Sequence, residues 1–272
     1  MGFEEIYYLC VIGIFGLVFG SFLTCAAMRI AEGEDFIHGR SRCISCGHEL
    51  GAADLIPVIS WLLLRGRCRY CRNRISAAYP LSEILFALLV IGIYIKHGVS
   101  VESARDVVLA GCLFVLSVVD IKCFEIPDGC LVIALAAWMI SAPFMGYDLK
   151  TTAFYVFSGL GCGIVMLGFS LLVDKATKKE SLGGGDIKLF ALLGLYLGMA
   201  HSYFMVLVSC IIGLIFAGVK SFFPPDIYKE NHLEEDTGIP PGAFPFGPSI
   251  SLAGYVMLLS GDKITQWYLN LF

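Results

Sequence analysis

The sequence has 272 residues, of which 57% are hydrophobic and 15% are charged, and its mean hydropathy is +0.79. Soluble globular domains carry roughly 25% charged residues, so this composition excludes an ordinary soluble protein and indicates a chain that crosses a membrane several times. The net charge of -4 says little by itself, and we expect no nucleic-acid partner.

Apolar segments separated by polar loops predict an all-α polytopic membrane protein with about eight transmembrane helices. Each segment is near the length that crosses ~30 Å of hydrocarbon, although several are short. We expect two of the short segments to extend, one past Asp120 and the other back toward Gly184. The first segment lacks a small-residue cleavage site, so we interpret it as a retained helix. The predicted segments are 6–28, 81–95, 107–119, 131–145, 153–173, 187–199, 204–219 and 248–259.

The distribution of lysine and arginine predicts the orientation of the chain in the membrane, because cytoplasmic loops carry the excess of these residues. If the loop after the first segment is cytoplasmic and the chain alternates, only four of the 19 basic residues face outside. These four are Lys96, Arg105, Lys150 and Lys263. Both termini then lie outside, and Asp120 and Asp186 both lie at the cytoplasmic face.

Asp120 and Asp186 each stand where an apolar run meets a polar loop. Two carboxyls brought together at a partly dry interface cannot both ionise comfortably, so one keeps a proton and the pair can act as general acid and base on a water. That is the chemistry of an aspartic protease. Considered separately, Asp186 could have the structural role of a helix cap. Asp120 is harder to explain in this way, because it ends a helix, where the dipole disfavours an anion. We expect the glycines 183–185 to allow unusual backbone torsions and the close approach of an extended peptide.

Four cysteines in the first cytoplasmic loop form two C-x-x-C pairs separated by a spacer. Two such pairs place four thiolates around one tetrahedral zinc, which predicts a small zinc-ribbon-like loop. Redox disulfides or spare thiols are the alternatives, and a reducing cytoplasm argues against structural disulfides. Four cysteines complete the site, so the zinc would be structural, and His38 and His48 are not expected to bind it. The cysteines are Cys43, Cys46, Cys68 and Cys71.

Together these motifs resemble the bacterial type IV prepilin peptidases, membrane aspartic proteases of the G-x-G-D type that also methylate pilin N-termini. The resemblance covers nearly the whole length, and the order of the motifs makes it specific. Besides the cysteine pairs, the matching blocks are Phe19-Gly20-Ser21-Phe22, Leu55-Ile56-Pro57, Arg65-Gly66-Arg67, Tyr79-Pro80, Glu83, Asp120, Ile126-Pro127-Asp128, Gly183-Gly184-Gly185-Asp186-Ile187-Lys188-Leu189 and Pro245-Phe246-Gly247-Pro248.

The resemblance implies a role for each matching residue. Asp120 and Asp186 match the catalytic aspartates, the four cysteines match the zinc ligands, and Gly66 matches a glycine linked to methyl transfer. The substrates would be prepilins or pseudopilins of type IV pili or type II secretion. They would be cut after a glycine and then N-methylated from S-adenosylmethionine, in the lipids of the bacterial inner membrane.

The corresponding division of the chain is a first transmembrane helix at 1–28, a zinc loop implicated in methylation at 29–80, and a peptidase core at 81–272. Three alternatives stay open. The protein could be a peptidase without methyltransferase activity, a transporter that uses paired aspartates as a proton or ion relay, or a scaffold that binds a partner through its zinc ribbon. The sequence does not determine the oligomeric state.

Overall fold

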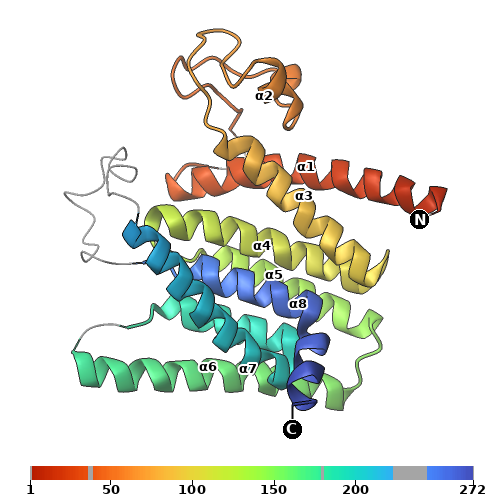
Figure 1. Ribbon diagram of the computed structural model, residues 1–272, viewed down its shortest axis with the longest axis vertical. Coiled ribbons are helices and arrows are strands. Elements are labelled where there is room, and N and C mark those ends of the chain that lie inside the picture. The colour runs from red at the N-terminus through yellow and green to blue at the C-terminus, as the bar shows by residue number, and fades with distance from the viewer. Residues whose placement is uncertain (1, 36–38, 179–180, 223–243, 272) are drawn as a thin grey trace. The chain divides into compact units, whose positions relative to one another are not determined.

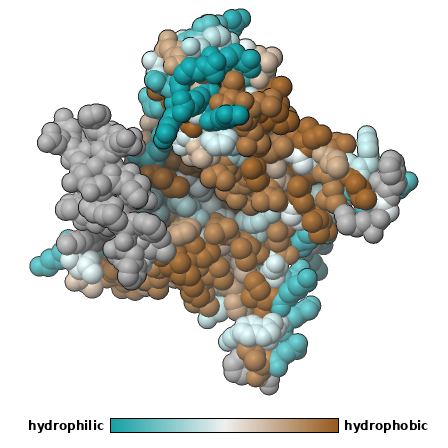
Figure 2. Space-filling model, turned by 45° about the horizontal axis from the view of Figure 1, so that its top comes forward, coloured by the Kyte–Doolittle hydropathy of each residue, from teal (hydrophilic) through white to brown (hydrophobic). Residues whose placement is uncertain are grey.

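In the computed structural model, residues 2–35, 39–178, 181–222 and 244–271 are described, and their regular structure is helical apart from two isolated β-bridges. Four helices are long and apolar enough to cross a membrane: α1 (Phe3–Ala31), α3 (Ala78–His97), α6 (Leu149–Thr177) and α7 (Gly184–Phe222). The protein is therefore a polytopic helical membrane protein. On the face shown in Figure 2, hydrophobic residues cover the helices, and hydrophilic residues gather on the loop between α1 and α3.

The chain divides into two compact units. The first comprises Met1–Cys123 and Pro127–Tyr147 and contains α1, α3, η1 (Ala52–Asp54), α2 (Ile59–Leu63), α4 (Val101–Cys123) and α5 (Asp128–Phe144). The second comprises Phe124–Ile126 and Asp148–Phe272 and contains α6, α7 and α8 (Gly247–Leu269). Asp120 therefore belongs to the first unit and Asp186 to the second.

In the first unit, α1 and α3 pack closely through small residues (Figure 1). A Cβ atom on Gly16 would lie 2.6 Å from the Cα of Ala87, and one on Gly20 would lie 3.1 Å from the Cα of Glu83. These glycines stand four residues apart on one face of α1, the spacing at which small residues let membrane helices approach. The Gly20 block of the sequence is thus a packing motif.

In the second unit, α7 is interrupted at Gly198, whose φ of 75° and ψ of 174° are not helical. The ring centroid of Phe246 lies 6.3 Å from that of Phe190, and a Cβ on Gly213 would lie 2.8 Å from the Phe246 ring. A straight helix would separate residues 190 and 213 by about 35 Å. The chain must therefore fold back near Gly198, which is the boundary expected between segments 187–199 and 204–219.

The helix ends around the aspartates largely follow the sequence. As predicted, α4 continues past Asp120 to Cys123, and α7 begins at Gly184. At the start of α5, Pro127 occupies the N-cap position and Asp128 is the first residue of the helix. Proline fits this boundary because it has no N–H and a fixed φ.

Candidate functional site

The loop between α1 and α3 contains two knuckles with the same backbone hydrogen bonds. In the first, the N–H of Cys43 donates to the carbonyl of His48 at 2.9 Å, and the carbonyl of Cys43 accepts from the N–H of Gly47 at 2.8 Å. The second knuckle repeats both bonds from Cys68, at 2.9 and 3.1 Å. The two C-x-x-C pairs are therefore held in matching conformations.

The two knuckles bring their four cysteines together. Their sulfur atoms all lie within 4.8 Å of one another, and those of Cys43 and Cys71 are 3.9 Å apart. Four thiolates at about 2.3 Å from a tetrahedral zinc lie about 3.8 Å apart, so the cluster fits this ion. The backbone N–H groups of Cys46 and Ser45 donate to Cys43 and lower its pKa to about 6, which favours its thiolate, whereas desolvation and the other three thiols raise the pKa of Cys71 to about 11. All four cysteines are free thiols, so the disulfide alternative is not found.

Side chains of the loop between α1 and α3 also interact with one another. The rings of His48 and Tyr70 lie in contact at a tilt of 38°, with centroids 3.6 Å apart. His48 is not part of the sulfur cluster, and His38 lies outside the described residues. The carboxylate of Asp54 accepts from Arg69 Nε at 2.6 Å and from the hydroxyl of Tyr70 at 3.2 Å. The hydrogen bond from Arg69 is the main reason that the pKa of Asp54 is lowered. The loop thus has its own polar framework.

Gly66 lies in a tight turn against Trp61. Its φ is +67°, and a Cβ would lie 2.9 Å from Trp61 Cζ2. Its N–H donates to the Trp61 carbonyl at 2.8 Å, and the Trp61 indole N–H donates to the Ile75 carbonyl at 3.1 Å. The backbone geometry is by itself a sufficient reason for a glycine at position 66, because other residues adopt this φ only with strain. Trp61 could not be predicted from the sequence, since one tryptophan in a loop carries no spacing signal.

Beside this turn lies an apolar pocket of about 270 Å³. S-adenosylmethionine carries an amino group, a carboxylate and ribose hydroxyls, which need polar partners when they are buried. The side chains that line this pocket offer the cofactor almost none, so the pocket does not fit it and we assign no methyl-transfer step there. The lining residues are Val58, Trp61, Leu62, Ala77, Pro80, Leu81 and Ile84.

Asp120 lies in the last turn of α4 and is 5% exposed. Leu116 and Val119 of the same helix are also buried, and the dipole at a helix C-terminus disfavours an anion there. Four residues later the chain leaves the helix at Phe124, which has a φ of +57°. A buried carboxyl at this position is expensive, as is typical of functional acids in membrane proteins.

Asp186 lies in the first turn of α7 and is partly buried. A Cβ on Gly183 would lie 3.4 Å from the Asp186 carboxylate, and one on Gly185 would lie 2.9 Å from the Cβ of Ile126. None of the three glycines has a positive φ, so the expectation of unusual torsions there is wrong. The glycine at 185 is needed because Ile126, from the segment after α4, packs against it.

Two family models match the chain. Residues 14–97 match the bacterial peptidase A24 N-terminal domain, and residues 107–218 match the type IV leader peptidase family. Proteins named prepilin leader peptidase/N-methyltransferase from Aeromonas hydrophila and Bacillus subtilis (strain 168) are each 31% identical to it. The alignments cover 97% of this chain and 95% and 98% of those relatives. A relative of the same name from Pseudomonas aeruginosa is 29% identical over 97% of the chain and 94% of its own length. No solved structure matches the chain.

The chain belongs to the type IV leader peptidase family. The match to the leader peptidase family contains both Asp120 and Asp186, and the match to the N-terminal domain contains the four cysteines and Gly66. This member of the family also has a buried Glu83 on α3, whose carboxylate accepts from the N–H of Val58 at 2.8 Å. The motif match included Glu83, but only the structure shows that it ties the loop between α1 and α3 to α3.

Proposed function

We propose that this protein cleaves the leader peptides of type IV prepilins and pseudopilins and then N-methylates the new N-terminus. The names of its relatives describe both activities, and their alignments cover nearly the whole chain. The observation that carries the peptidase half is that each aspartate of the motif occupies a helix end within the leader peptidase match. Asp120 is buried, and Asp186 is partly buried and follows three glycines.

The connection between the two units supports the proposal that Asp120 and Asp186 act as a pair. Ile126 follows Asp120 by six residues and packs against Gly185, which directly precedes Asp186. Six residues span at most about 20 Å even when fully extended, and the chain here is partly helical. The short chain length between Asp120 and the residue that packs against Gly185 therefore supports the proposed pair.

In the proposed reaction, one aspartate is ionised and removes a proton from a water molecule as the water attacks the scissile glycine carbonyl. The other aspartate is protonated and donates its proton to the carbonyl oxygen. The tetrahedral intermediate then collapses, the C–N bond breaks, and the amine leaves with a proton returned by the dyad. No covalent enzyme intermediate forms.

We further propose eight membrane spans in the bacterial inner membrane, with both termini outside and the aspartates at the cytoplasmic face. Support comes from the distribution of lysine and arginine and from the turn at Gly198, which makes α7 a helical hairpin. With α1, α3, α4, α5, α6 and α8, the described helices then supply eight segments. A leader held on the cytoplasmic side would meet the aspartates there.

For methylation, we propose that the zinc loop at 29–80 holds a structural zinc and contributes to transfer of a methyl group from S-adenosylmethionine, with the peptidase core at 81–272. Gly66 remains our candidate residue, although its contact with Trp61 gives it a structural role as well. A tetrahedral zinc with four cysteine ligands has no open position for substrate, so its contribution would be to the fold of the loop.

A cleavage assay with a purified prepilin in detergent tests the dyad. Asp120→Asn and Asp186→Asn should each lower turnover by at least about 100-fold, because each removes one half of the acid–base pair. Asp128→Asn is the matched control and should keep most of the activity, because this aspartate is exposed at the start of α5. Near-normal turnover in either of the first two variants would overturn the assignment.

A further inference from the structure

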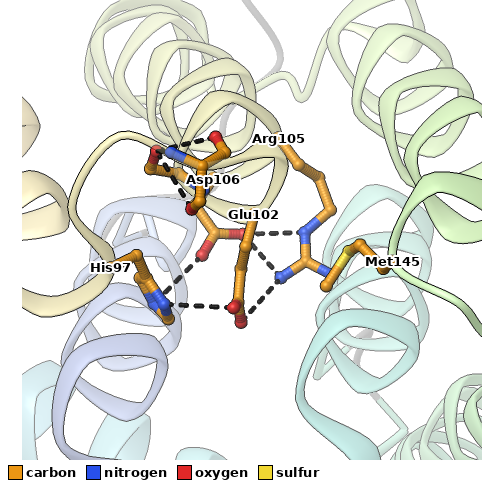
Figure 3. A network of polar contacts seen from close by, with 7 residues as sticks. His97, Glu102, Arg105, Asp106 and Met145 are labelled. Carbon is orange, nitrogen blue, oxygen red and sulfur yellow. Dashed lines mark hydrogen bonds and ion pairs between the residues drawn. The ribbon is translucent and has the colours of Figure 1, made fainter.

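A second group of possible metal ligands lies in the first unit, where α3 ends and α4 begins. His97 is the last residue of α3, and Glu102 and Asp106 lie in the first turns of α4. One ligand atom from each can be chosen so that all three lie within 4.8 Å of one another. Figure 3 shows these side chains pointing toward one another. The site belongs neither to the cysteine cluster nor to the aspartate pair.

Two polar atoms in this group are buried and have no hydrogen-bond partner among the described residues. Asp106 is 0% exposed, and within the described part of the chain neither its Oδ2 nor His97 Nε2 has a hydrogen-bond partner. Leaving a buried polar atom unpaired costs about 1–3 kcal/mol, and more for a charged one. The two atoms face each other at 3.5 Å, too far for a good hydrogen bond.

This distance fits two ligands of one metal ion. Ligand atoms at about 2.0–2.1 Å from a tetrahedral zinc lie about 3.4 Å apart. The other oxygen of Asp106, Oδ1, accepts from Arg105 Nε and Nη2, both at 2.8 Å. Arg105 thereby fixes the carboxylate with Oδ2 directed at the imidazole, the kind of support that orients metal ligands. The Arg105 side chain is itself 3% exposed, and its Nη1 lies 3.3 Å from the sulfur of Met145.

We propose that His97, Glu102 and Asp106 bind a divalent transition-metal ion of the zinc class. One imidazole nitrogen and two carboxylate oxygens form a ligand set that zinc takes readily. The Glu102 side chain is 41% exposed, so the ion can enter from that side. Bound metal would join the end of α3 to the start of α4. Along α4, Asp106 is about 21 Å from Asp120, so this metal takes no part in peptide cleavage.

Metal analysis of the purified full-length protein tests the proposal. After saturation with zinc and removal of unbound metal, the protein should hold two zinc ions per chain. Asp106→Asn and His97→Gln should each reduce this to one. His201→Gln is the matched control, because His201 also faces an aspartate at 3.5 Å, but that residue, Asp262, is 70% exposed. The control should keep both ions.

Cobalt substitution separates the two sites. In a variant with all four cysteines changed to serine, cobalt should still bind and show visible d–d bands without the thiolate charge-transfer band. Glu102→Gln alters an exposed side chain that folding should tolerate, and it should weaken this binding at least tenfold. A wild-type zinc content that is unchanged by both Asp106→Asn and His97→Gln would overturn the proposal. So would cobalt binding that is unchanged by Glu102→Gln and Asp106→Asn, because the metal would then lie elsewhere.

Discussion

Gly185→Ala tests the packing that ties the segment after α4 to the glycine turn. The added Cβ would lie 2.9 Å from the Cβ of Ile126 and 3.4 Å from its Cγ1. Ordinary contacts between such carbons are about 3.5–4.0 Å, so either the segment or the helix must move by 0.5–1 Å or so. Overpacking of this kind costs about 1–3 kcal/mol.

The shift should affect catalysis more than folding. A misplacement of about 1 Å in a catalytic group can lower the rate by about 100-fold, so we expect kcat/KM for prepilin cleavage to fall by about 10- to 100-fold. Gly184→Ala is the matched control, because nothing lies within 4 Å of its added Cβ. Within a helix, alanine is favoured over glycine by about 1 kcal/mol, so this variant should be at least as stable as the wild type.

The assay is cleavage of a purified prepilin at several substrate concentrations, with thermal unfolding of each variant measured in the same detergent. A Gly185→Ala enzyme that cleaves within twofold of Gly184→Ala would refute the reasoning. Loss of activity in both variants would also count against it, because the two added methyl groups differ only in what they meet.

Three other changes probe the rest of the molecule. Changing all four cysteines of the zinc cluster to serine should remove that zinc, as measured by elemental analysis, and make the loop sensitive to protease while the membrane helices stay folded. Gly66→Ser should impair N-methylation more than cleavage, as judged by mass spectrometry of the mature pilin. Zinc content is the control for an intact loop, and a fully methylated product would argue against a role of Gly66 in methyl transfer. Gly198→Ala should destabilise the protein by about 1–3 kcal/mol, because its backbone conformation is essentially restricted to glycine, whereas Gly161→Ala meets no neighbour and should not; equal thermal stability of the two variants would contradict the turn at Gly198.

Local sequence patterns determined the class of this protein and the position of most helices. Hydropathy and segment length do not depend on distant residues, so they predicted a polytopic helical protein and the extension of α4 past Asp120. The two C-x-x-C pairs predicted a cluster of four sulfurs for the same reason, since each knuckle is formed within a few residues.

Only the tertiary structure decided which distant residues approach one another. The two apolar segments within α7 were predicted separately, but no pattern inside α7 encodes the contacts of Phe246 with both of its halves. Gly185 is required by Ile126, which lies far from it in sequence. His97 and Asp106 face each other because two helix ends meet. Close approach of backbones and buried polar pairs depend on how helices pack, whereas periodicity and spacing report only on the chain near each residue.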